Sequence, residues 1–132
     1  MVMPSKAKRP RRLPTRSCLG PVADLEAHLP EEWWRKLFNA LYVKTDGDVV
    51  ENTENTRREV DFIVSSAAIQ PHSNILDLCC GQGRHCLELA RRGFKHVMGL
   101  DRSRYLVRLA KKRAQNESLQ VLFKEGDARN PR

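Results

Sequence analysis

Three short segments of the sequence carry glycines and carboxylates at spacings that suit the binding of a nucleoside. The first contains Gly81 and Gly83, and glycines in such a turn let the backbone approach a ligand that a Cβ would keep away. Asp101 follows 18 residues after Gly83, where a carboxylate can accept two hydrogen bonds from a ribose diol. Asp127, in the segment EGDAR, is placed to accept a hydrogen bond from an adenine amino group. Together these residues predict a ligand that contains adenosine.

Two further positions indicate which kind of adenosine ligand the turn accepts. A dinucleotide fingerprint needs a third glycine in the pattern G-x-G-x-x-G, and this sequence has Cys86 at that position. Asp77 lies just before the turn, where its negative charge disfavours phosphates and favours a ligand with an amino group or a sulfonium. S-adenosylmethionine carries both groups. A fragment of an NAD-binding oxidoreductase is therefore the less favoured alternative.

Alternating strand and helix patterns are expected to position these residues. Short apolar runs bounded by turn residues predict strands at 74–80, 96–101 and 119–127, and helical patterns occupy 84–93 and 102–116. This order with short connections indicates parallel strands joined by right-handed crossovers. We therefore expect an α/β fold with the first half, strands 1–3, of a Rossmann-like doubly wound parallel sheet. Ligands of such sheets bind outside the carboxyl ends of the strands.

A two-helix preface is predicted between residues 21 and 71, ahead of the half-domain at 72–132. Its first helix starts at Pro30, because proline suits the first helical position. The segment KTDGDVVEN that follows is typical of a loop. The second helix opens at Thr53 and ends before Pro71, since the residue before a proline is disfavoured in helical geometry.

The net charge of +8 is concentrated at the N-terminus. Residues 1–20 carry six Lys and Arg and no acid, and three prolines prevent a continuous helix, so we expect a disordered basic tail. Three more specific functions are the alternatives for this segment: a nucleic-acid-binding arm, a nuclear localisation signal or an organellar transit peptide. No apolar run approaches the roughly 18 residues that a membrane-spanning helix needs, so no membrane partner is expected.

The four cysteines, Cys18, Cys79, Cys80 and Cys86, have no paired C-x-x-C spacing. This pattern predicts neither a disulfide framework nor a metal site, and a reducing, cytoplasmic setting fits it best. Cys80 and Cys86 are expected to be small core residues, because the sequence places no partner base beside either thiol. His85, in the first turn of a helix, is expected to be structural.

In this combination of motifs the sequence resembles the class I S-adenosylmethionine-dependent methyltransferases. ILDLCCGQGRHCLELARRG is similar to their first motif, VMGLDRS to their second-strand motif and VLFKEGDAR to their third-strand motif. The resemblance covers about residues 72–130, with the motifs in the family's order. It implies S-adenosylmethionine as the cofactor and methyl transfer as the activity.

The resemblance also assigns roles to residues of the turn and the strand ends. It places Asp77 near the methionine amino group, wraps the backbone of residues 79–83 around the methionine and ribose, and gives Asp101 the ribose hydroxyls. Other residues flank the adenine or read its edge. The complete cofactor-binding set is Asp77, Cys79, Gly81, Gly83, Asp101, Arg102, Asp127 and Ala128. The family often has glycine where Cys79 stands, and we expect cysteine to serve there with a negative φ.

The upstream segment 41–63 resembles the helical part that covers the cofactor in small-molecule members of this family, which makes Tyr42 a candidate lid residue. A small-molecule methyl acceptor is therefore the expected partner, and an RNA acceptor is less favoured. Trp33 and Trp34 are expected to pack the preface onto the sheet. A non-enzymatic remnant or interaction fragment that binds S-adenosylmethionine is the alternative to an enzyme.

The sequence ends shortly after Asp127, whereas the family resemblance implies seven strands in the order 3-2-1-4-5-7-6. Strand 4 and the loop after it usually carry acceptor-side residues, so no catalytic residue is assigned and the half-domain is expected to be truncated. Without strand 4, the first strand becomes an apolar edge. This predicts self-association, partial disorder, or pairing with a complementary polypeptide that supplies the missing strands.

Overall fold

The computed structural model describes residues 32–131 of the 132-residue chain. The predicted basic tail and the first part of the preface, residues 21–31, lie outside the described residues. The described preface contains the 3₁₀ helix η2 (Trp33–Lys36) and the helices α1 (Ala40–Thr45), α2 (Gly47–Val50) and α3 (Thr53–Ser66). The elements after it are β1 (Asn74–Leu78), α4 (Arg84–Arg91), β2 (His96–Asp101), α5 (Arg104–Asn116) and β3 (Leu122–Glu125).

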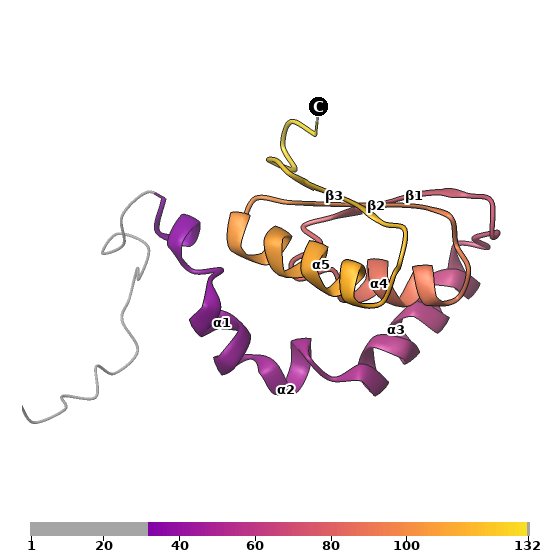
Figure 1. Ribbon diagram of the computed structural model, residues 1–132, viewed down its shortest axis with the longest axis horizontal. Coiled ribbons are helices and arrows are strands. Elements are labelled where there is room, and N and C mark those ends of the chain that lie inside the picture. Colours follow the sequence, from indigo (N-terminus) through magenta and orange to yellow (C-terminus); the bar gives the residue numbers. More distant parts are fainter. Residues whose placement is uncertain (1–31, 132) are drawn as a thin grey trace, which may run out of the picture. The chain divides into compact units, whose positions relative to one another are not determined.

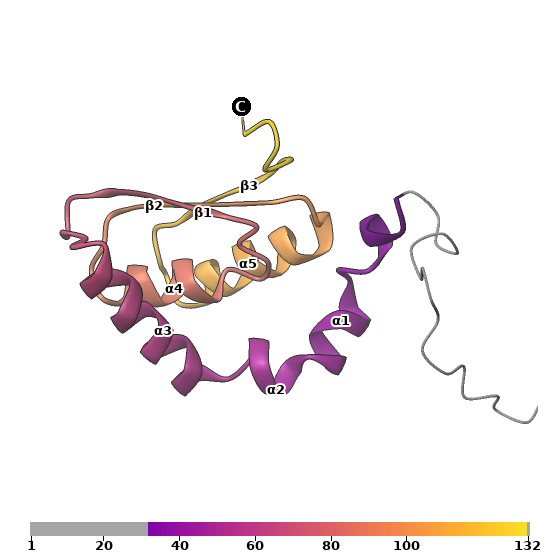
Figure 2. The ribbon, with the colours of Figure 1, turned by 180° about the vertical axis from the view of Figure 1, so that it is seen from behind.

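The three strands form one parallel sheet in the order β1-β2-β3. Helices α4 and α5, which connect the strands, lie on the same face of the sheet, and α3 packs against α4 (Figures 1 and 2). The predicted fold class is confirmed: this unit is the first half of a Rossmann-like doubly wound sheet.

The first preface helix is interrupted, which the sequence reasoning did not predict. Asn39 has an extended backbone, with φ −135° and ψ −164°, and its side chain accepts a hydrogen bond from the Leu41 backbone N–H at 2.7 Å. An asparagine in this geometry caps a new helix and ends the one before it. The expected single helix is therefore divided into η2 and α1, and the expected loop contains the short helix α2.

Three other boundaries differ from expectation because single residues adopt left-handed backbone geometry. β1 ends at Leu78, since Cys79 has φ +62°. Helix α3 ends earlier than the proline requires, with Ala68 at φ +49°. Ser118, at φ +54°, closes α5 in the same way, and β3 runs from Leu122 to Glu125. Left-handed residues just beyond a helix are a common way to end it.

The core lies between the sheet and the two helices that cross over it. Leu87 on α4 and Leu106 on α5 are fully buried, and Phe123 on β3 is buried beneath α5. Gly83 makes this packing possible, because a Cβ at that position would lie 2.6 Å from Phe123 Cζ and 3.0 Å from Ala110 Cβ. Gly83 therefore serves the contact between helix and sheet as well as the turn.

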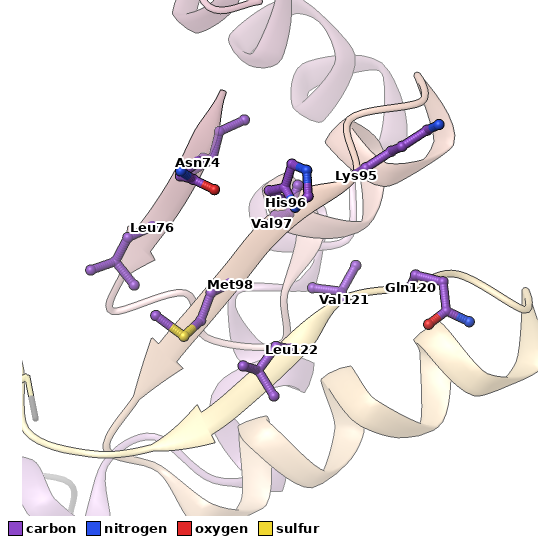
Figure 3. A pocket seen from close by; sticks show the side chains of 10 residues that line it. Asn74, Leu76, Lys95, His96, Val97, Met98, Gln120, Val121 and Leu122 are labelled. Atoms are coloured by element: carbon purple, nitrogen blue, oxygen red, sulfur yellow. The ribbon is translucent and has the colours of Figure 1, made fainter. Parts of the chain in front are cut away.

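The opposite face of the sheet carries an apolar row of side chains and is open in the described part of the chain. Leu76, Met98 and Leu122 are register partners and lie side by side across the three strands (Figure 3). Leu76 is 44% exposed and Leu122 is 54% exposed. Sheets of parallel strands are normally covered on both faces, so this row of side chains is unusual in a water-exposed position.

Among residues 32–131, no helix has the length and apolar character required to cross a membrane.

Gly83 and Gly93 offer a matched test of the packing role of Gly83. Both have positive φ, +78° and +90°, but a Cβ at Gly93 would meet nothing within 4 Å. Alanine at either position carries the backbone strain, and only Gly83→Ala adds overpacking. We expect Gly83→Ala to lose about 1–3 kcal/mol more than Gly93→Ala in urea denaturation. Equal losses would show that the contact with Phe123 relaxes at no cost.

Candidate functional site

A cavity lies at the carboxyl ends of the strands, where the topology predicts a ligand. Its walls come from the three strand ends, the first turn of α5, and the preface from η2 to α1. Cys79, Asp101, Arg102, Asp127 and Ala128, all assigned to the cofactor site from the sequence, line it together. The other assigned residues, Asp77, Gly81 and Gly83, do not line this cavity. Its remaining lining residues are Trp34, Arg35, Phe38, Tyr42, Leu100, Ser103, Leu106, Gly126 and Arg129.

Asp101 is held in place by backbone N–H groups on two sides. Gly81 N donates to Oδ2 at 2.8 Å, and Ser103 N donates to Oδ1 at 2.7 Å. Each carboxylate oxygen keeps a further acceptor position, as two hydroxyls of a ribose diol require. Asp101 is not the cap of α5, because the N-cap is Ser103, whose Oγ accepts from Leu106 N at 3.2 Å.

Gly81 contributes backbone geometry at the same place. Its φ is +55°, and within residues 32–131 a Cβ built on it would have only Leu106 Cδ1 near it, at 3.9 Å. The space beside Gly81 is therefore open, in contrast to the filled space beside Gly83. This turn leaves room for a ligand to approach the backbone.

Asp127 is surrounded by guanidinium groups. Arg129 donates from Nη2 to Oδ2 at 2.6 Å and from its backbone N to Oδ1 at 3.0 Å, and Arg102 Nη1 donates to Oδ2 at 3.1 Å. The hydrogen bond from the Arg129 side chain is the main reason that the pKa of Asp127 lies well below its usual range. An adenine amino group would share a carboxylate that already accepts these bonds. Sequence reasoning missed Arg129, although it stands only two positions from Asp127.

Aromatic side chains of the preface form the outer wall of the cavity. The Trp34 ring lies over the Arg102 guanidinium, with 4.3 Å between Cζ and the ring centroid. Phe38 and Tyr42 make an edge-to-face pair with centroids 5.1 Å apart. Tyr42 thus lies where a lid residue would stand. Trp34 lines the cavity, whereas Trp33 is exposed, so the expected packing of both side chains onto the sheet is not observed.

Asp77 lies on the helix-covered side of the sheet, away from the cavity walls. Its Oδ2 accepts from Cys86 Sγ at 3.4 Å. Burial raises the pKa of Asp77, and this effect exceeds the opposing ones from the Cys86 hydrogen bond and the charges of His85 and Arg84. A carboxylate in this state gains most from a cationic partner.

The expectation that Cys79 has a negative φ is wrong, because its φ is +62°. A side chain costs about 1–2 kcal/mol in this left-handed geometry, which explains why glycine is common there in the family. The pKa of the Cys79 thiol is raised by burial first and then by the charges of Asp101 and Asp77. Cys79 is therefore a neutral thiol at the cavity wall.

The remaining candidates have structural environments. Cys86 is fully buried, and its pKa is raised chiefly by its hydrogen bond with Cys80. His85 Nε2 lies 2.7 Å from Glu59 Oε2 on α3, and Arg84 binds the same oxygen, so both side chains tie α4 to α3. Within residues 32–131, no three His, Cys, Asp or Glu side chains are grouped to hold a metal ion.

Comparison with known proteins agrees with this geometry. Residues 75–132 match the family model described as "Methyltransferase domain". This part of the chain is similar to that family and is consistent with a fragment of a class I S-adenosylmethionine-dependent methyltransferase. The cofactor of the methyltransferases it resembles is S-adenosylmethionine, as the Asp77 and Asp101 pattern predicts.

Solved methyltransferase-like structures share the fold. Coclaurine N-methyltransferase, bound to N-methylheliamine and SAH, is 27% identical with a TM-score of 0.52 over 56% of this chain and 22% of that one. The [4+2]-cyclase SpnF is also 27% identical, with a TM-score of 0.53 over 57% and 29%. An S-adenosylmethionine-dependent methyltransferase from Clostridium acetobutylicum, at 19% identity, shows the fold alone, with a TM-score of 0.57 over 69% and 37%. The chain thus spans well under half of each of these structures.

The left-handed Cys79 gives a testable expectation for this methyltransferase half-domain. Cys79→Gly removes the strain and Cys79→Ala keeps it, while glycine loses about 0.5–1 kcal/mol of that advantage through the entropy of the unfolded chain. We expect the glycine variant to be more stable than the alanine variant by up to about 1.5 kcal/mol in thermal unfolding. A more stable alanine variant would mean that residue 79 has a negative φ in solution.

Proposed function

We propose that this chain binds S-adenosylmethionine and supplies the methyl-donor side of a methyltransferase. The observation that carries the proposal is Asp101, a carboxylate fixed by two backbone N–H groups at the wall of a cavity that Asp127 also lines. The residues fit this cofactor. The space beside Gly81 is open, and within residues 32–131 Asp77 has no cationic side chain as a hydrogen-bond partner. When bound, the cofactor supplies a methyl group on a sulfonium.

The chain's own residues then bind and orient the cofactor. Asp101 would hold the ribose hydroxyls, Asp127 and the Ala128 backbone would contact the adenine, and Arg102 would lie beside it. Positioning of this kind is the main means by which an enzyme assists an in-line transfer to a nucleophile. No residue of this chain is assigned as a general base.

We further propose a small-molecule methyl acceptor. Trp34, Phe38 and Tyr42 line the cavity from the preface, which suits a compact acceptor enclosed beside the cofactor. The structure of coclaurine N-methyltransferase, one of the relatives, holds the small molecule N-methylheliamine. A cytoplasmic location completes the proposal, because a reducing compartment keeps Cys79, Cys80 and Cys86 as the free thiols found here.

A second candidate is binding of the cofactor without methyl transfer. The observation that favours it is SpnF, whose name describes a cyclase although its fold matches this chain as well as the N-methyltransferase does. A fold by itself does not determine the reaction.

Calorimetric titration tests the proposed cofactor. We expect the chain to bind S-adenosylhomocysteine more tightly than NAD, and Asp101→Asn to weaken this binding at least tenfold. Each hydrogen bond to a charged group is worth about 1.5–3 kcal/mol, and the variant loses the charge and one acceptor oxygen. Glu125→Gln is the matched control, since Glu125 is the register partner of Asp101 but binds Arg104 outside the cavity. Unchanged affinity in Asp101→Asn would contradict the assignment of Asp101 to the ribose hydroxyls.

A partner for the open sheet is also part of the proposal. In the described residues β1 pairs only with β2, which leaves its other edge unpaired beside the apolar row of Leu76, Met98 and Leu122. An unpaired edge next to an apolar face favours association. We propose that a complementary polypeptide pairs here and that a second copy of the chain takes its place when the chain is alone.

Light scattering over a range of concentrations tests this surface. We expect Leu122→Glu to reduce self-association, because it places a charge at the β3 end of the apolar row. Gln115→Glu makes the same change of charge on the exposed side of α5 and is expected to leave association unchanged. A wild-type chain that stays monomeric at every concentration would refute the proposed pairing.

A further inference from the structure

Gln82 is buried in the turn between the two left-handed glycines, yet its side chain leaves the turn to contact the preface. It is only 3% exposed. Its Nε2 donates to the Val50 carbonyl oxygen at 2.8 Å and to Glu51 Oε1 at 3.3 Å. The partners lie 32 and 31 residues earlier in the chain, where α2 ends. A buried amide needs such partners, and here they belong to a different segment.

The segment held in this way is the strap, which we define as residues 38–51 and which includes α1 and α2. Its first residue is fixed at the other end, where Ser103 Oγ donates to the Phe38 carbonyl at 2.6 Å. Glu51 at its last residue also accepts from Arg113 Nη2 on α5 at 2.7 Å. Between these anchors the strap contributes Phe38 and Tyr42 to the cavity wall.

The turn that holds the strap is the same turn that holds Asp101. Gly81 N donates to Asp101 Oδ2 on one side, and the next residue, Gln82, donates to the strap on the other side. A shift of the turn would therefore displace both the carboxylate in the cavity and the end of α2. Packed and hydrogen-bonded elements of this kind transmit small displacements between sites.

We propose that Gln82 is a positioning residue that couples occupation of the cofactor cavity to the order of the strap. This inference rests on the proposed function. With a ligand on Asp101 the turn is held, Gln82 keeps its bonds to the end of α2, and Tyr42 stays at the cavity wall. Without the Gln82 amide, the ligand still contacts Asp101, but its binding no longer increases the order of the strap.

Hydrogen exchange of the strap amides, measured with and without S-adenosylhomocysteine on the full chain, tests the coupling. In the wild type the ligand is expected to slow exchange at residues 43–50. In Gln82→Met, which keeps the length but removes the donor, this slowing is lost while the affinity falls by less than tenfold. Gln82→Lys restores a donor toward Val50 and Glu51 and is expected to recover the slowing.

Gln70→Met is the control, because Gln70 also donates to a carbonyl, that of Ala68 at 3.2 Å, but lies outside the site. Should Gln82→Met not fold, Gln82→Ala removes the same donor and introduces no new group. Ligand-induced slowing that survives in the folded variant overturns the coupling and leaves the proposed function intact. A wild-type chain that binds no S-adenosylhomocysteine overturns the proposed function and this inference with it.

Discussion

Asp101 joins the three strand ends on which the site depends. Its carboxylate accepts from Gly81 after β1 and from Ser103 before α5, and its backbone oxygen accepts from Gly126 after β3 at 3.0 Å. Because parallel strands bring their carboxyl ends to one edge, a single residue there can hold three loops in register. A hydrogen bond from a backbone N–H group to a charged acceptor is also stronger than one to a neutral acceptor. The cavity keeps its shape because these loops share one acceptor residue.

Much of this arrangement could be predicted from sequence, because it follows from local patterns. The alternation of apolar runs and amphipathic helices predicts the parallel topology. The acids at two strand ends predict that the site lies at the carboxyl edge of the sheet. Cys79 shows where a local rule was misapplied. Its position in the turn demanded a left-handed backbone, and the glycine usual at that place was the available signal.

The features that sequence reasoning could not predict are contacts between distant segments. Gln82 meets Val50 across 32 residues, and Gly83 meets the ring of Phe123 from another strand. Nothing in the neighbouring residues of the sequence distinguishes these roles from those of ordinary turn residues. Asn39 is intermediate, since it is a good cap by type but stands within a run of helix-forming residues.

The half-buried carboxylate of Asp77 has a consequence for the lifetime of the protein. A raised pKa means that folding disfavours the charged form, so the stability that Asp77 contributes is complete only in acid and is lost as pH rises through its folded-state pKa. In the ligand-free chain, burial thus imposes a free-energy cost on the charged form of Asp77. A ligand with positive charge near Asp77 would relieve it and stabilise the folded state in proportion to its concentration. Cellular abundance would then follow the supply of that ligand, since proteases degrade chiefly the unfolded form.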